Sequence, residues 1–354
     1  MNTIPTIFNE KIIPYTAVGG KERSGSAGIS AVVLNRPGPP RRSIFQDLEK
    51  AGFDNVISIE SCSPHYDIEE LSGRFPFVRF ILPENQINLG CRINLAASEI
   101  ESPLFFVMHS DMKIIAGGTA RRMAERLSVS SGENEDNSEK KIGFKRLCTV
   151  PMIMNSNYEV LPTLTAPVTW RKKIRTCFMD PLHDGGLTLY PYDGIGIYDR
   201  QRFIHTGGFD ITLDQTYWQL MDFGFRAHLW GEEIAINLHY KLSYDGELPR
   251  ENYSVKDSYK RFYLKNLAAV FKNDYAHLSF YSFPGFLFKS GEDLSSAWEE
   301  FKEVRRWVKI NKYRWKCDAH AVTSLWDTST ISGSVIHDEN NVSANVGESF
   351  SLGD

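Results

Sequence analysis

The chain has 354 residues, of which 42% are hydrophobic and 24% are charged, and its formal net charge is −4. These values are typical of a globular protein with one large or two medium domains. They exclude the excess of positive charge that nucleic-acid binding requires, so we expect no nucleic-acid partner. The five cysteines include no Cys-x-x-Cys pair, which argues against a zinc site and favours a reducing compartment.

The N-terminus lacks the features of a secretion signal. Residues 1–14 have no basic flank followed by a long apolar core, and no run in the chain approaches the roughly 18 apolar residues that a membrane span needs. We therefore predict a cytoplasmic protein.

The first third of the chain alternates between strand and helix patterns. Residues 1–28 are predicted to be a flexible lead-in, because they mix Gly, Ser and charged residues. Short apolar runs predict strands at 29–34, 55–59 and 77–82, and helical spacing predicts a helix at 90–100. This alternation predicts an α/β fold, with a doubly wound or mixed sheet flanked by helices.

A fourth predicted strand ends in a polar triplet. The apolar run from Leu104 to Met108 is typical of a strand that is buried on both faces, and His109-Ser110-Asp111 follows it. Open α/β sheets bind ligands outside the carboxyl ends of their strands. Asp111 there could hold a divalent metal on a diphosphate, or it could simply cap a helix that begins near Met112.

The remaining two thirds of the chain complete one domain and add an extension. Residues 29–290 are predicted to form the domain, with a mobile loop at 128–141 and a helix at 214–230. Residues 291–317 are predicted to carry a helix that begins with the capping box Ser296-x-x-Glu299. Residues 318–354 contain no Lys or Arg and are predicted to be a disordered tail.

Residues 305–316 combine six basic residues with Trp307, Tyr313 and Trp315. The stretch could be a solvated helix end. Alternatively it could contact a membrane surface, with its cations toward anionic lipid and its tryptophans in the interface. The second interpretation would place the protein at the inner face of a membrane.

The order of short motifs from Ile29 to Asn266 resembles the family 2 glycosyltransferases of the GT-A, or nucleotide-diphosphosugar transferase, fold. The resemblance implies a single mixed, mostly parallel sheet flanked by helices, with a helical C-terminal extension. It also implies that six residues at strand ends and in a Gly-x-x-x-Asn segment bind the donor: Asn35, Arg36, Glu60, Asn94, His109 and Asp111.

The resemblance further implies a divalent metal ion. His109 stands where the family's Asp-x-Asp motif has its first aspartate. The metal ligands would then be Asp111 and His109, with His239 as the late histidine that some members have. Arg261 and Asn266, further along the chain, resemble the Arg-Asn pair of the same members. An imidazole ligand favours Mn²⁺ over Mg²⁺. A histidine in an apolar strand such as that of His239 could also be structural, and Glu60 and Asn94 could be ordinary turn and helix residues.

Two downstream segments, Gly207-Gly208-Phe209-Asp210 and 221–226, resemble the motifs on the acceptor side. In this interpretation Asp222 is the general base, and its position opposite the leaving group implies inversion at the anomeric carbon. The acceptor-side residues would be Gly207, Gly208, Asp210, Trp218 and Arg226. Asp222 and Arg226 could instead be a surface ion pair on a helix, and the two glycines a tight turn.

The function predicted from this set is transfer of a hexosyl or related sugar from a nucleotide-diphosphate donor to a hydroxyl of a glycan, lipid-linked or protein acceptor. One alternative is a nucleotide-sugar-binding protein without catalysis, which the loss of the first aspartate at His109 suggests. Another is a nucleotidyltransferase, which would need a Gly-rich loop and a lysine after the first strand. Residues 37–42, Pro-Gly-Pro-Pro-Arg-Arg, match that loop poorly.

Overall fold

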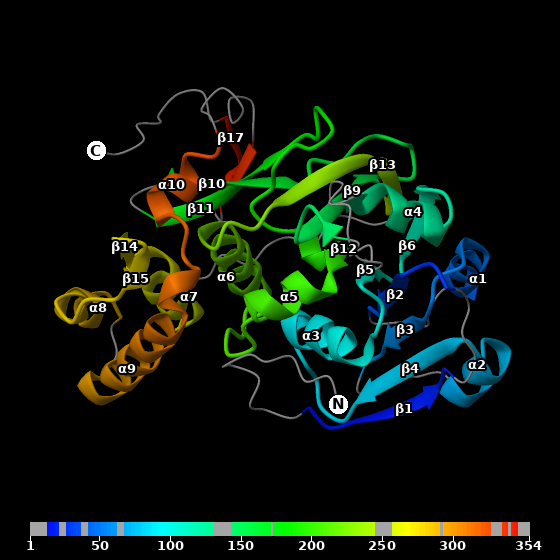
Figure 1. The fold of residues 1–354 in the computed structure, drawn as a ribbon, viewed down its shortest axis with the longest axis horizontal. Helices are drawn as coiled ribbons and strands as arrows, with labels where there is room; N and C mark the ends of the chain where they lie inside the picture. The colour runs from blue at the N-terminus through cyan, green and yellow to red at the C-terminus, as the bar shows by residue number, and fades with distance from the viewer. Residues whose placement is uncertain are drawn as a thin grey trace, which may run out of the picture.

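The computed structural model describes residues 13–20, 26–36, 42–61, 67–129, 143–170, 173–244, 257–290, 293–326, 335–338 and 341–345. A central sheet has helices on both sides, and a mainly helical extension lies at one end (Figure 1). Most of the predicted loop at 128–141 and of residues 37–42 falls outside these ranges. Only Ser128 and Val129 of the first are described, as strand β7 (Ser128–Val129), which pairs with β8 (Gly143–Phe144).

Four parallel strands form the first half of the nine-stranded sheet. They are β2 (Ile29–Leu34), β3 (Val56–Ile59), β4 (Val78–Pro83) and β5 (Leu104–His109), in the order β4-β3-β2-β5. Every residue of β2, β3 and β5 is buried. A strand that has helices on both faces of its sheet is buried on both sides, so almost all of its residues are apolar or small. The predicted strands are confirmed.

The second half of the sheet is mixed. Strand β12 (Gly196–Asp199) runs antiparallel between β5 and β9 (Cys148–Met154), and β13 (Ile234–Tyr244) lies parallel beside β9. The antiparallel strands β6 (Met112–Ala116) and β1 (Tyr15–Gly19) form the two edges. Six of the nine strands therefore point the same way, which confirms the mixed, mostly parallel sheet. Strand β1 also corrects the lead-in prediction, because residues 15–19 pair with β4 along their whole length.

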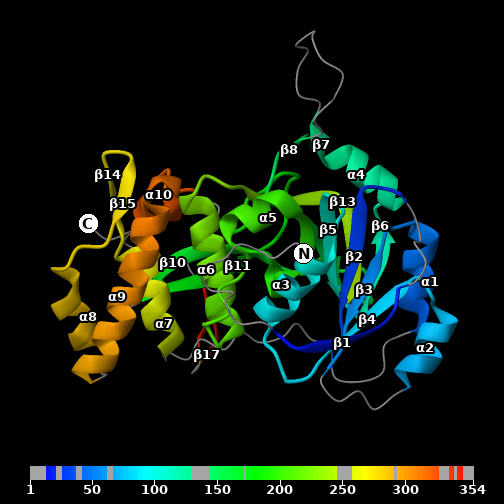
Figure 2. The same ribbon diagram turned by 60° about the horizontal axis from the view of Figure 1, so that its bottom comes forward.

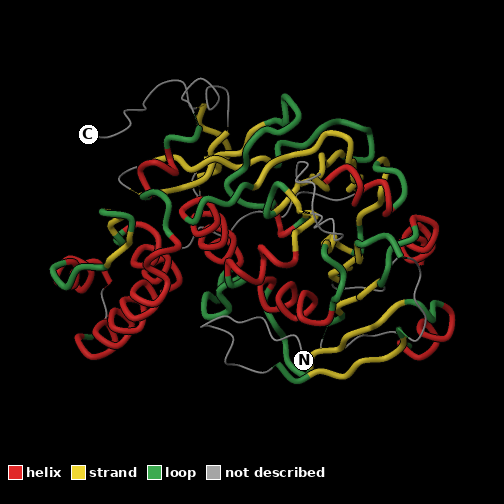
Figure 3. Tube along the Cα trace, viewed as in Figure 1, coloured by secondary structure: helices red, strands yellow, loops and turns green. Residues whose placement is uncertain are grey.

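Helices cover both faces of this sheet (Figure 3). One face buries α1 (Arg42–Ala51), α2 (Ile68–Arg74) and α4 (Ala120–Leu127). The other face buries α3 (Leu89–Glu99), α5 (Arg200–Thr206) and α6 (Thr216–Leu229). Side chains of β2 alternate between the two cores, with Ala31 and Val33 in one and Val32 and Leu34 in the other. The helices begin where the sequence offers caps, as when Asn88 accepts the amide hydrogen of Cys91 at 2.9 Å.

The extension follows β13. It contains α7 (Asp257–Phe262), a π-helical turn (Tyr263–Leu267), the hairpin β14 (Val270–Lys272) and β15 (Tyr275–His277), α8 (Ser282–Ser290) and α9 (Leu294–Asn311). Asp293 caps α9 by accepting from the amides of Ser295 and Ser296. The predicted capping box at Ser296 and Glu299 is therefore wrong, because the helix begins two residues earlier.

The C-terminal stretch that we predicted to be disordered contains ordered elements. After the 3-10 turn Lys312–Arg314, α10 (Ala319–Thr323) packs on α6, and Trp326 donates from its indole nitrogen to the carbonyl oxygen of Leu187 at 3.3 Å. The strands β16 (Val335–Asp338) and β17 (Asn341–Asn345) extend a second sheet that begins with β10 (Leu164–Trp170) and β11 (Lys173–Met179). The apolar Val322 and Trp326 explain why this part packs.

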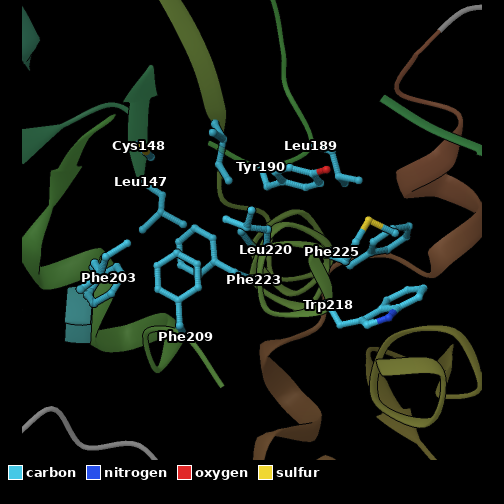
Figure 4. Packing of buried hydrophobic residues seen from close by; sticks show 14 of the residues in the cluster. Leu147, Cys148, Leu189, Tyr190, Phe203, Phe209, Trp218, Leu220, Phe223 and Phe225 are labelled. Atoms are coloured by element: carbon cyan, nitrogen blue, oxygen red, sulfur yellow. The ribbon is translucent and has the colours of Figure 1, made fainter. Parts of the chain in front are cut away.

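Helix α6 lies against the loop that carries Leu189 and Tyr190 (Figure 4). Gly224 permits this approach, because a Cβ at that position would overlap the carbonyl oxygen of Leu189 and lie 3.0 Å from the Cβ of Tyr190. The oxygen belongs to the backbone, so it cannot move aside by changing a rotamer.

We therefore expect Gly224→Ala to lower the free energy of unfolding by about 1–3 kcal/mol, although alanine is the better helix former. The matched control is Gly73→Ala in α2, where an added Cβ meets nothing within 4 Å. The control should raise stability by about 0.5–1 kcal/mol. Denaturant unfolding of both variants tests this, and equal effects of the two substitutions would contradict the close packing of α6.

Candidate active site

The strand order reverses beside β2. The chain runs from β2 outward through β3 and β4 and then returns to β5 on the other side of β2. Such a reversal is the point at which open α/β sheets bind ligands, outside the carboxyl ends of the strands. Asn35 and Arg36 follow the end of β2, and Ser110 and Asp111 follow the end of β5. The structure therefore brings four residues of two predicted motifs to one edge of the sheet.

Arg36 joins two acids at this edge. Its guanidinium donates to Oδ2 of Asp111 at 2.8 Å, to Oδ2 of Asp193 at 2.5 Å and to the hydroxyl oxygen of Tyr244 at 2.7 Å. The side chains of Arg36, Asp111 and Asp193 are 23%, 26% and 17% exposed, so a ligand can reach them. Burial lowers the pKa of Arg36, but Asp193 and Asp111 outweigh it and raise that pKa above its usual value. Arg36 is therefore a permanent cation.

Asp193 also holds His109. The Nε2 atom of His109 lies 3.0 Å from Oδ2 of Asp193 and 3.1 Å from its backbone oxygen. Both of these atoms accept hydrogen bonds, so the Nε2 atom carries a proton and donates it. Burial raises the pKa of Asp193, but His109 and Arg36 together lower it below its usual value. Asp193 is therefore a fixed negative charge that orients both neighbours.

The sequence motifs missed Asp193. It lies in the turn Tyr192–Gly194 with a φ of 49°, in the left-handed region where Asp is tolerated. The hydroxyl of Tyr198 donates to the carbonyl oxygen of Gly194 at 2.7 Å and fixes the turn. The available signal was the Asp-Gly pair between two apolar runs, which predicts a turn but does not tell which strand ends the turn faces.

Glu60 ties the ends of β2 and β3 together. Asn35 donates from Nδ2 to Oε2 of Glu60 at 2.7 Å, and the hydroxyl of Ser58 donates to Oε1 at 2.5 Å. Glu60 is 2% exposed. Both carboxylate oxygens of Glu60 thus accept from protein donors. They do not face the open edge, where the predicted contact to the sugar donor would require them.

Asn94 also has a different place from the one predicted. Its amide donates to the carbonyl oxygen of Phe209 at 2.8 Å and accepts from the amide nitrogen of Phe209 at 2.9 Å. This pairing fixes the Gly207-Gly208-Phe209-Asp210 segment against α3. Asn94 is buried, so it holds the backbone of Phe209 and does not face the open edge.

The predicted base, Asp222, is fully buried. Its Oδ2 atom accepts from Nη2 of Arg226 at 3.0 Å, and its Oδ1 atom accepts from Asn266 at 2.9 Å and lies 2.7 Å from Nζ of Lys265. Neither oxygen faces an open edge, whereas a general base must lie within hydrogen-bond reach of the proton that it removes. The placement gives Asp222 a role in the core instead. The expectation of inversion depended on Asp222 as the base and loses that support.

Asp210 and Arg226 belong to the same buried network. Asp210 accepts from Lys265 at 2.8 Å and from Nε of Arg261 at 3.3 Å. Burial raises the pKa of Asp210, but Lys265 and Arg261 hold it far below its usual range. Arg226 donates to the backbone oxygens of Thr206 and Gly208, so its cation also caps the end of α5.

Three further predicted residues lie away from any open edge. Gly207 ends α5 in the left-handed conformation, with a φ of 87°, and Gly208 follows with a φ of 62°. Trp218 is 2% exposed and lies among the buried side chains of the core (Figure 4). Its ring packs against Tyr259 and Phe262 at centroid distances of 5.0 and 5.3 Å. A sugar ring therefore cannot stack on Trp218 without opening this core.

His239 is not near the acids at the switch point. It is exposed on β13, within an irregularity between Asn237 and Lys241. Tyr244, which contacts Arg36, lies five residues further along the strand, or roughly 15 Å away. The structure brings together Asp111 and His109 of the three predicted metal ligands, but not His239.

The sequence matches no family model and no curated protein. Among solved structures, GalNAc-T7 with UDP, GalNAc and Mn²⁺ matches with a TM-score of 0.49 and 11% identity, over 80% of this chain and 57% of that chain. S. aureus TarS matches with a TM-score of 0.42 and 14% identity, over 66% of this chain and 38% of that chain. This chain thus spans little more than half of the first and less than half of the second. Similarity at this level does not establish a shared activity, which must be argued from the residues of this chain.

We expect Asp222→Asn to lower the free energy of unfolding by about 3–5 kcal/mol, because it leaves Lys265 and Arg226 buried with an uncompensated charge. The matched control is Glu125→Gln, whose partner Arg121 is also four residues away on a helix, but whose side chain is 60% exposed. That change should stay within about 0.5 kcal/mol. Denaturant unfolding gives both values. A stable Asp222→Asn variant that loses only turnover would restore Asp222 as the base.

Proposed function

We propose that this chain is a glycosyltransferase that takes its sugar from a nucleotide-diphosphate donor, with the diphosphate held at the carboxyl ends of β2 and β5. The observation that carries this proposal is the partly exposed group of Arg36, Asp111 and Asp193 at the strand-order reversal, with the buried His109 held against Asp193. The motif resemblance to the GT-A family 2 enzymes supports the same position for the donor.

Arg36 suits the diphosphate. A guanidinium is planar and can donate two parallel hydrogen bonds to phosphate oxygens. In the free protein its charge is shared between Asp111 and Asp193. A bound diphosphate would lie beside this cation, which offsets the negative charge that develops as the sugar leaves.

The residues fit a divalent ion that is shared with the donor. Asp111 Oδ1 and His109 Nδ1 are buried and make no hydrogen bond to the residues that the structure describes. Because the Nε2 atom of His109 donates to Asp193, its Nδ1 atom presents a lone pair in the neutral imidazole, which is the common arrangement of metal-binding histidines. Within the described ranges no three His, Cys, Asp or Glu residues form a metal-binding group. Two protein ligands suffice where substrate phosphates and water complete the shell.

When bound there, Mn²⁺ or Mg²⁺ would act as a Lewis acid on the diphosphate. The imidazole ligand favours Mn²⁺. Asp193 would position His109, and Asp111 would hold the ion at the end of β5. The acceptor hydroxyl, whether on a glycan, a lipid-linked sugar or a protein, would approach from the exposed side of these residues.

Asp111→Asn should abolish donor hydrolysis that depends on Mn²⁺, because the amide is a weaker and uncharged ligand. The assay measures release of nucleoside diphosphate from a panel of nucleotide sugars, and calorimetry measures donor binding. Asp214→Asn, which changes an exposed acid before α6, is the control and should behave as wild type. Unchanged metal-dependent hydrolysis in Asp111→Asn would contradict the proposal. Donor binding without any turnover in the wild-type protein would favour the non-catalytic binding protein.

Asp193→Asn should weaken Mn²⁺ binding in the presence of nucleoside diphosphate by about 10- to 100-fold, since it replaces the charged carboxylate that orients His109 with a neutral, weaker acceptor. His109→Asp should instead shift the preference toward Mg²⁺. Titration calorimetry with each ion measures both effects. If the Asp193 variant binds Mn²⁺ as tightly as the wild type, His109 is not a ligand that Asp193 positions.

A further inference from the structure

Helices α8 and α9 form a hairpin at the end of the molecule that lies farthest from α1 and α2 (Figures 1 and 2). Its inner contacts are aromatic. Phe283 of α8 lies 4.9 Å from the ring of Trp298 and 5.2 Å from the ring of Phe301 on α9, and Phe286 is buried beside them. The side of α8 that carries Phe283 and Phe286 is therefore fully used in packing.

The opposite side of α8 is apolar and uncovered. Tyr281, Pro284, Gly285 and Phe288 are all exposed, and they follow the spacing i, i+3, i+4 and i+7 that places residues on one face of a helix. Tyr281 is 95% exposed and Phe288 is 92% exposed. Single exposed apolar residues are ordinary, but an aligned stripe marks a surface that binds something.

Neighbouring apolar side chains widen this stripe. Phe280 is 51% exposed, and Leu294, at the start of α9, is 63% exposed. We refer to Phe280, Tyr281, Pro284, Gly285, Phe288 and Leu294 as the α8 face.

Cations border the α8 face. The guanidinium carbon of Arg305 lies 3.6 Å from the ring centre of Phe280, and Nζ of Lys302 lies 5.8 Å from the ring centre of Trp298. Lys302, Arg306 and Lys309 are exposed along α9. Residues 305–316 hold six basic residues and no acid. The exposed acids Glu299 and Glu303 lie on the same helix, and exposed Asp293 caps its start. Glu303 pairs with Arg261 at 2.7 Å, and Asp293 accepts from the amides of Ser295 and Ser296.

We propose that the α8 face docks on an anionic lipid bilayer, with its aromatic side chains in the interface and the cations of α9 near the headgroups. A short helix with an apolar face and a basic flank binds in the plane of the interface. Among the described residues no helix is long and apolar enough to cross a membrane, so the contact is peripheral.

This surface differs from the one predicted at residues 305–316. Trp307 and Trp315 are buried, and their rings pack on each other and on Trp230 at centroid distances of 5.6–5.9 Å. These tryptophans cannot enter a lipid interface without unfolding the end of α9. The membrane-facing aromatics come from α8 instead, and the basic residues of the predicted stretch supply only the charge.

A second copy of the chain fits the α8 face less well. A symmetric contact would bring the same cations together from both copies. In addition, α8 has nine residues and is therefore about 14 Å long. One side of so short a helix falls short of the roughly 800 Å² per partner that a stable interface buries.

The test is sedimentation of the full chain with vesicles of phosphatidylcholine alone or of phosphatidylcholine and phosphatidylserine in equal parts. We expect binding to the anionic vesicles only, with weaker binding at high salt. The double variant Tyr281→Ser/Phe288→Ser should bind at least tenfold less, and Lys302→Glu/Lys309→Glu should lose the preference for the anionic lipid. Because all four side chains are exposed, thermal unfolding should stay as in the wild type.

The matched control is Tyr158→Ser/Leu182→Ser, which removes aromatic and aliphatic side chains that are 67% and 81% exposed elsewhere on the surface. It should bind as the wild type does. Equal binding by the Tyr281/Phe288 variant, or no binding by the wild type, would overturn the proposal. Self-association of the wild type that the Tyr281/Phe288 variant abolishes, without vesicle binding, would overturn it in favour of a second copy. The measurement needs no donor, so it is independent of the proposed transferase activity.

Discussion

The fold depends on a buried balance of charge around Lys265. Its amino group lies 2.8 Å from Asp210 and 2.7 Å from Asp222, and all three side chains are 0% exposed. Burial lowers the pKa of Lys265 below its usual value, although the two acids raise it, so the ammonium depends on both carboxylates. Lys265 lies in the π-helical turn of the extension, whereas the acids lie before and on α6. The extension is therefore part of the same folded unit as the sheet, because removing it would take Lys265 and Arg261 from Asp210 and leave Asp222 with Arg226 alone.

The charged group around Asp222 and the one around Asp193 differ in solvent access. That difference decides which of them can bind a substrate. Around Asp222 the carboxylate and the cations of Arg226 and Lys265 are enclosed, and they pair with one another. Around Asp193 the side chains of Arg36, Asp111 and Asp193 are 17–26% exposed, whereas His109 is 4% exposed. Two polar atoms of this group, Asp111 Oδ1 and His109 Nδ1, make no hydrogen bond to described residues. A closed network stabilises, but it offers nothing to a substrate. A partly open group with unused acceptors can exchange its internal partners for a ligand, which is why the proposed donor site is placed at Arg36, His109 and Asp111.

The sequence predicts the strands well because each parallel strand is an apolar run between turn residues, and burial on both faces leaves no other pattern. It also predicts that His109 and Asp111 lie at a carboxyl end. Sequence patterns fail to predict contacts between residues that are distant in the chain. The spacing of Asp222 and Arg226 predicts their ion pair, but it does not tell whether that pair is buried or exposed. Nothing near Asp222 in the sequence indicates its second partner, Lys265, which comes 43 positions later. Asp193 reaches His109 across 84 positions through a turn whose direction is set by tertiary packing. For the same reason β1 and α10, whose partners lie far away in the chain, look disordered in isolation.

Residues 90–94 of α3 contact both the ends of β2 and β3 and the segment that precedes α6. Arg92 donates to the carbonyl oxygens of Asn35 and Ile59, at the ends of β2 and β3. Ile93 lies so close to the turn of Asp193 that a Cβ at Gly194 would be 2.6 Å from its Cδ1 atom. Asn94 holds Phe209, and the amide of Gly90 donates to Gln219 on α6. Four neighbouring residues thus fix the strand ends, the turn that orients His109 and the segment before α6. The Gly-x-x-x-Asn segment therefore sets the spacing between the donor site and α6, although Asn94 does not itself contact the donor site.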